Sequence, residues 1–169
     1  MKTSAIIAAA LMACSVGFAE QADAQGRARG ARVNEAGGVS AGQVHNNGRR
    51  AGARGVVTDG NGNAAAGGVS CAQGEAGRAC RAGVTTVTEE GAVNHHSGAA
   101  VQGANGAGAV TQGGFTRSED GVVTGQRDTT IADAEGNARN ATTTYDSANG
   151  ITRTVTCTNA NGAVVACPN

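Results

Sequence analysis

The sequence predicts a mainly β protein: a Gly-rich array of short β-hairpins, stapled by two local disulfides and preceded by a disordered basic N-terminal arm. Three observations predict this fold class. Turn-type residues followed by glycine recur every 14 or 15 residues, Val and Thr alternate with polar residues between them, and two cysteine pairs bracket turns. We expect a signal peptide over 1–24, a basic Gly/Ala/Arg-rich flexible arm over 25–55, and the hairpin repeat region over 56–169.

The first segment has the features of an export signal. A short basic start is followed by an apolar run over 5–13 that is too short to cross a bilayer, and small residues offer cleavage after Ala19 or Ala24. We therefore expect a secreted protein, extracellular or periplasmic, with no transmembrane span. As an alternative, residues 11–14 resemble a bacterial lipobox, which would anchor the chain through a lipid on Cys14.

The chain after residue 24 is poor in residues that build a core. It holds no Leu, Met or Trp, and its large apolar residues are sixteen Val, two Ile, one Phe and one Tyr. This content is below the level at which a chain normally buries a core. We therefore expect neither an enzyme nor a cofactor site.

Charge is unevenly distributed along the chain. Residues 25–58 contain six Arg against one acid, whereas residues 59–169 contain six Arg against ten acids. A basic flexible segment suits an anionic polysaccharide or lipopolysaccharide, although a solvated linker without a partner is the alternative. It lacks the interleaved aromatic residues that base stacking needs, so nucleic acid is not expected. The candidate polymer-binding residues are Arg27, Arg29, Arg32, Arg49, Arg50 and Arg54.

The turn series gives the repeat. Asn-Gly and Asp-Gly favour type I′ hairpin turns, because Asn and Gly tolerate positive φ. The glycines that mark these turns are Gly48, Gly62, Gly77, Gly91, Gly106, Gly121, Gly136, Gly150 and Gly162. A second break follows about seven residues later, at Gly55, Gly67-Gly68, Gly83, Gly98 and Gly113-Gly114. Each unit is therefore expected to contain two short strands and two turns.

The last unit gives the clearest strand. Residues 151–158 alternate strictly, so the four Thr from Thr152 to Thr158 share one face, and Ile151, Val155 and Cys157 share the other.

Four cysteines remain after residue 24, an even number that indicates disulfides in an exported chain. Cys71 and Cys80 bracket one turn, and Cys157 and Cys167 bracket another, so each pair is placed to join the two strands of one hairpin. We expect these two bridges, each stabilising the fold by about 2–3 kcal/mol.

Few residues offer catalytic or metal chemistry. The adjacent His95 and His96 fall on opposite faces of a strand and cannot chelate one ion together, so no metal site is expected from them. Asp59, Asn61 and Asn63 imitate the first half of a calcium loop, but an Asx-capped turn explains the same pattern.

Residues 145–156, Tyr-Asp-Ser-Ala-Asn-Gly-Ile-Thr-Arg-Thr-Val-Thr, resemble one unit of the YD repeats of bacterial Rhs-type surface proteins. Residues 57–63 and 133–137 resemble it more faintly, and the match covers about a quarter of the chain. The resemblance implies β-hairpin geometry and a surface location. The Thr face of residues 152–158 is also similar to ice-binding β proteins, which need a flat Thr array over several coils.

Together these features predict an exported structural or adhesive protein of the cell surface or extracellular matrix, without catalytic activity. Self-association through β edges is expected to accompany this role. The alternatives are a binder of anionic envelope polymers that acts through its Arg-rich arm, and an ice- or calcium-binding β module.

Overall fold

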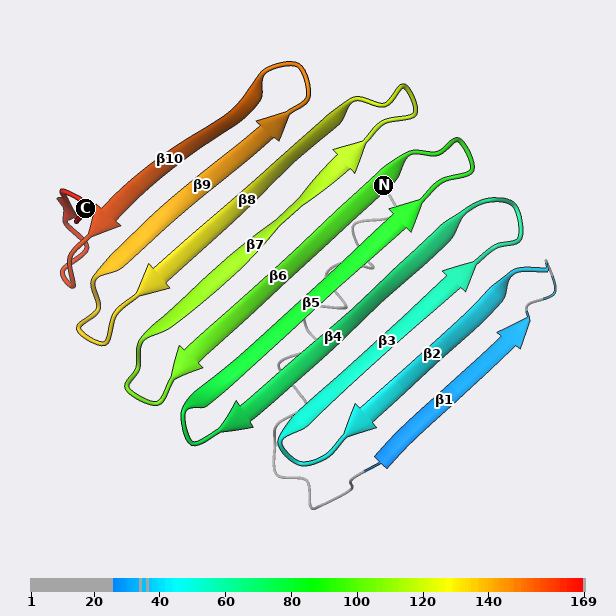
Figure 1. The fold of residues 1–169 in the computed structure, drawn as a ribbon, viewed down its shortest axis with the longest axis horizontal. Helices are drawn as coiled ribbons and strands as arrows, with labels where there is room; N and C mark the ends of the chain where they lie inside the picture. Colours follow the sequence, from blue (N-terminus) through cyan, green and yellow to red (C-terminus); the bar gives the residue numbers. More distant parts are fainter. Residues whose placement is uncertain (1–25, 34, 36, 169) are drawn as a thin grey trace.

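The protein is one antiparallel β-sheet in which every strand pairs with its neighbours in the sequence (Figure 1). The structure, a computed structural model, describes residues 26–33, 35 and 37–168. The strands are β1 (Gly26–Val33), β2 (Val39–Asn46), β3 (Arg50–Thr58), β4 (Ala64–Gly74), β5 (Gly77–Val87), β6 (Val93–Gly103), β7 (Gly108–Arg117), β8 (Val123–Ala132), β9 (Ala138–Asp146), β10 (Gly150–Thr158) and β11 (Val164–Val165). The prediction of a mainly β hairpin array is confirmed.

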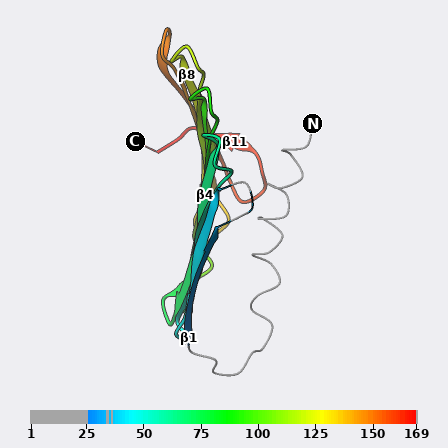
Figure 2. The same cartoon turned by 90° about the vertical axis from the view of Figure 1, so that its right-hand side faces the viewer.

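The sheet is a single layer, as its edge-on view shows (Figure 2). The chain exposes 12084 Å² of surface, whereas a compact protein of 16.4 kDa exposes about 7,500 Å². Among the described residues, the only buried hydrophobic ones are Cys71 and Cys157. Backbone pairing and disulfides therefore hold this fold together, and both faces of the sheet are open to a partner.

The nine marker glycines all lie at turns, with φ between 77° and 134°. In six of the nine turns, the turn type differs from the expected type I′. In these six turns, the residue that precedes the three-residue loop donates its N–H to the carbonyl of the residue that follows the loop. In five of them, the N–H of the marker glycine also donates to the carbonyl of that preceding residue. Asp133, Gly136 and Asn137 show both bonds. This pattern belongs to a three-residue loop in which glycine takes the left-handed position.

The second set of glycines does not form turns, so the prediction of two strands per unit is wrong. Gly67-Gly68 and Gly113-Gly114 lie inside β4 and β7, and each repeat contains one long strand and one turn. A Cβ on Gly113 would lie 2.1 Å from the Gln126 carbonyl oxygen, and one on Gly114 would lie 2.0 Å from that of His95. Glycine is needed there because neighbouring backbones approach closely, and not because the chain reverses.

The expected flexible arm over 25–55 is also corrected. Residues 26–58 supply β1, β2 and β3, which extend the sheet with continuous registers. Strand pairing uses backbone groups, so a Gly/Ala/Arg segment can join a coreless sheet without large apolar side chains. Residues 1–24, with the expected signal peptide and Cys14, lie outside the described residues. β1 is an edge strand, and its unpaired backbone groups are the kind that pair with another chain. Self-association at this edge stays a prediction.

Both expected disulfides are present. Cys71 on β4 is directly opposite Cys80 on β5, and the two are bonded with a Cα separation of 4.0 Å. Cys157 on β10 bonds to Cys167 with a Cα separation of 5.2 Å. Cys167 follows β11 and is not a strand partner, because Cys157 is paired with Val165.

Candidate functional site

The strand register separates the side chains into two different faces. Residues directly opposite each other in an antiparallel sheet point to the same side, and successive residues of a strand point to opposite sides. We call the side of Cys71 and Cys80 the polar face and the other side the arginine face. The arginine face holds nine exposed arginines: Arg27, Arg29, Arg50, Arg54, Arg81, Arg117, Arg127, Arg139 and Arg153.

The acids do not share this face. Of the strand carboxylates in the described chain, Asp128 and Asp146 lie on the polar face, together with Arg32 and Arg78. The remaining described acids are in the turns between strands. One face is therefore cationic without interspersed negative charge, whereas the other is balanced and rich in Thr, Gly and Ala.

Six of the nine arginines fall in two adjacent cross-strand rows, which we call the arginine track. One row runs from Arg29 through Arg54, on β3, to Arg127 on β8 and Arg153 on β10. The second row contains Arg27 and Arg81. The track crosses the strands at right angles over about 43 Å, since neighbouring strands lie about 4.8 Å apart.

A shallow depression of about 520 Å³ lies along the middle of the track. Arg54, Arg81 and Arg127 line it, with Ser70 and Ser97. Its floor is low because the row between Arg54 and Arg127 is made of Gly68, Gly83, Ser97 and Gly113. Glycine at three of these four positions thus keeps the floor low between the cationic positions.

Arg127 is fixed across this floor. Its guanidinium donates to the Oγ of Ser97 at 3.0 Å and to the Oγ1 of Thr111 at 3.3 Å. Ser97 is two strands away on β6, so the side chain lies over Gly113, which is its direct partner on β7. A fixed guanidinium loses less conformational freedom when it binds an anion.

An aromatic row runs beside the track on the same face. His95, Phe115 and Tyr145 belong to one cross-strand row, in which Gly125 lies between Phe115 and Tyr145. The rings of His95 and Phe115 stack at a centroid distance of 5.4 Å, and the Thr85 hydroxyl is 2.8 Å from His95 Nδ1. Phe115 and Tyr145 are 41% and 42% exposed, so both rings are available to a ligand.

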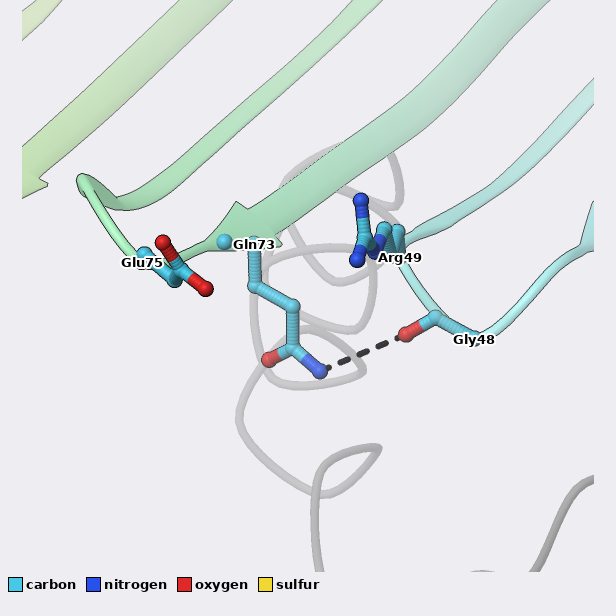
Figure 3. Close-up of a pocket in the computed structure, with 5 residues that line it drawn as sticks. Gly48, Arg49, Gln73 and Glu75 are labelled. Atoms are coloured by element: carbon cyan, nitrogen blue, oxygen red, sulfur yellow. Dashed lines mark hydrogen bonds between the residues drawn. The ribbon is translucent and has the colours of Figure 1, made fainter.

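A second hollow, of about 540 Å³, lies at the strand ends between the β2–β3 and β4–β5 turns (Figure 3). Arg49, Gln73 and Glu75 line it, and the Gln73 amide donates to the Gly48 carbonyl at 3.4 Å. The hydrogen bond joins two turns, which is a structural role. This hollow lacks the aligned cations of the depression on the arginine face.

The six arginines proposed from the sequence are placed in three different ways. Arg27, Arg29, Arg50 and Arg54 lie on the arginine face, Arg32 lies on the polar face, and Arg49 is in a turn. Sequence reasoning missed the other arginines of this face: Arg81, Arg117, Arg127, Arg139 and Arg153. Their shared face depends on the length of every strand and turn, which composition does not reveal.

The proposed calcium residues form an Asx-capped turn. Asp59 accepts the N–H groups of Asn61 and Asn63 at 2.8 and 3.1 Å and the Asn63 side-chain amide at 2.6 Å. The side-chain bond from Asn63 is the main cause of the lowered pKa of Asp59. Asp133 is bonded in the same way by Asn137, which lowers its pKa too. Both carboxylates are occupied by their own turns.

Other candidate chemistry is sparse in the described chain. His95 and His96 lie on opposite faces of β6, as their adjacency predicts. Within residues 26–33, 35 and 37–168, no three His, Cys, Asp or Glu side chains are grouped so that they could hold a metal ion. The same residues contain no helix that is long and apolar enough to cross a membrane.

Comparison of the chain with family models, with curated proteins and with solved structures found no match.

Proposed function

We propose that this protein is a non-catalytic adhesive sheet that attaches to an anionic surface through its arginine face. The observation that carries the proposal is the segregation of charge between the two faces of one layer. Nine arginines project from one side of β1 to β10 without a strand carboxylate beside them. A cationic surface of this kind attracts polyanions and holds them through many weak contacts.

The architecture supports adhesion in preference to catalysis. A catalytic site needs side chains held in place by a packed shell, and the only buried hydrophobic residues of the described chain are two disulfide cysteines. A flat sheet instead offers an extended area, which suits a partner that is itself extended. The proposed secreted location agrees with the two disulfides, which persist in oxidising compartments.

Retention of the full chain on beads tests the proposal. The beads would carry a linear anionic polysaccharide, a neutral dextran or a cationic polymer. We expect retention on the anionic beads alone, and release by salt because exposed charges are screened. Replacing Arg54, Arg81 and Arg127 by Gln should weaken retention. The same change at Arg32 and Arg78 of the polar face serves as the control.

Two results would contradict the proposal. In one, the chain is retained equally on neutral and anionic beads. In the other, the polar-face variant loses as much binding as the arginine-face variant. Circular dichroism of each variant would show that the sheet is intact.

A Thr array on the polar face favours ice binding as a second candidate. Nine threonines of β7 to β10 project from this face: Thr116, Thr124, Thr130, Thr142, Thr144, Thr152, Thr154, Thr156 and Thr158. The array extends over four strands, further than the single Thr strand expected from the sequence. Thermal hysteresis of the full chain tests this role. It should fall in Thr154→Lys and persist in Thr143→Lys, since Thr143 lies on the arginine face.

A further inference from the structure

We infer that the occupant of the arginine track is a linear anionic polysaccharide that lies across the strands along the glycine-floored depression. This inference rests on the proposed function and names the ligand class and its path. Its first support is the direction of the track. The aligned arginines run perpendicular to the strands from β1 to β10, so they mark a line on the face and not a ring or an isolated cluster.

The backbone spacing of the arginine positions along the track fits a polymer with regularly separated acidic groups. The arginines of the track stand on β1, β3, β5, β8 and β10. Most successive positions are two strands apart, which corresponds to about 10 Å. An unbranched polysaccharide with one acidic group in each two-sugar unit presents charges at comparable intervals.

The uncharged groups of the depression suit sugars. Gln43, Ser70, Ser97 and Thr111 line it between the guanidinium groups. Their hydroxyl and amide groups can both donate and accept hydrogen bonds, as sugar hydroxyls do. The side-chain-free floor at Gly68 and Gly83 lets a flat ring approach the backbone.

The aromatic row lies on one flank of the track. Phe115 and Tyr145 belong to the next row on the same face, about 7 Å away along the strands. The apolar face of an exposed ring can cover the apolar face of a sugar bound in the depression. The stack with His95 holds the Phe115 ring beside this path.

Two other polyanions fit this face less well. Single-stranded nucleic acid needs an aromatic platform for successive bases, but the three rings are confined to β6, β7 and β9, whereas the track begins at β1. A bilayer is entered by Trp, Leu and Phe side chains, and Phe115 is the single member of that group between residues 26 and 168. The sheet therefore favours a polymer that stays in water.

The path can be tested with two triple variants of equal charge. One replaces the depression arginines, Arg54, Arg81 and Arg127, by Gln. The control replaces Arg50, Arg117 and Arg139, which share the arginine face but lie in other rows near the strand ends. All six side chains are exposed, so neither variant should disturb the sheet, and circular dichroism and urea unfolding would verify this.

Binding of the full chain to hyaluronan would be measured by titration calorimetry. Hyaluronan is a linear polysaccharide with a carboxylate on every second sugar. We expect the depression variant to lose at least about tenfold in affinity, and the control about threefold or less. Equal losses would overturn the inferred path and leave the proposed function intact. An absence of binding to any anionic polymer would overturn both.

Matched titrations identify the ligand class. The same chain would be titrated with a single-stranded oligodeoxynucleotide and with vesicles that contain anionic lipid, at equal charge concentration. We expect hyaluronan to bind most tightly, and Tyr145→Ala to weaken hyaluronan binding by several-fold. Tighter binding of the oligonucleotide or of the vesicles would overturn the inference for a polysaccharide.

Discussion

Because the sheet has no packed core, the Cys71–Cys80 disulfide should account for a large part of its stability. The bridge closes a loop with a sequence separation of 9 residues. The chain-entropy model assigns such a loop about 2.6 kcal/mol, obtained by restricting the unfolded chain. Net stabilities of folded domains are about 5–15 kcal/mol, so the loss is substantial. We expect Cys71→Ala/Cys80→Ala to unfold at clearly lower urea concentration than the native chain.

The assay is urea unfolding followed by the β-sheet signal in circular dichroism. With a slope of about 2 kcal/mol per molar, the midpoint should fall by about 1.3 M. Reductant should lower the midpoint of the native chain, and should act on the double variant only through the remaining Cys157–Cys167 bridge. An unchanged midpoint in the double variant would contradict this expectation, because it would show that the bridge does not restrict the unfolded chain.

Three further predictions follow from turns, close approaches and charge. Gly114→Ala should destabilise the sheet by about 2–3 kcal/mol in urea unfolding, whereas Gly30→Ala, whose Cβ meets nothing within 4 Å, should not. The pKa of Asp133 is lowered in the folded chain, so the ionised carboxylate stabilises the fold. This stabilisation is complete at pH values above the usual carboxyl pKa and is lost as the pH falls through the lowered pKa of the folded chain. Acid should therefore lower the thermal midpoint of the native chain, and Asp133→Asn should reduce this dependence; an equal dependence in both proteins would count against the prediction. Polysaccharide binding should weaken from about 0.05 M to about 0.5 M salt, and salt-independent binding would exclude an electrostatic contact.

The positions of the turns could be predicted because a residue type and a backbone conformation coincide there. Gly91, Gly106 and Gly121 all have positive φ, which glycine adopts without strain. The same residue type misled the prediction at Gly113, since glycine also marks places where two backbones approach closely. One sequence cannot separate the two causes, because the second depends on the neighbouring strand.

The disulfides were predictable for a related reason. Cys71 and Cys80 flank one turn, so a local hairpin brings them together without information from the rest of the chain. The arginine face needs much more. Arg54 and Arg127 share a row only because four intervening strands and five turns have the lengths that place them there. One residue more in any turn could move Arg127 to the other face or to another row.

The basic segment shows how composition alone gave a wrong boundary. Gly and Ala are depleted in ordinary strands, so the composition predicts a flexible basic arm over 25–55. In β1, however, Arg27 and Arg29 alternate with Ala28 and Gly30. This period of two places both arginines on one face. In a sheet without a core, alternation of charge is as informative as alternation of hydrophobicity.

The most direct test of the arginine face uses Tyr145, the single tyrosine of a chain that has no tryptophan. Tyr145 is 42% exposed and lies in the row beside the track, so its fluorescence reports on this face alone. Quenching by neutral acrylamide would be measured as hyaluronan is added to the full chain and to the depression variant. We expect the polymer to protect Tyr145 in the native chain and to leave it unprotected in the variant at the same concentration. Polymer binding that leaves Tyr145 equally accessible to acrylamide would contradict it.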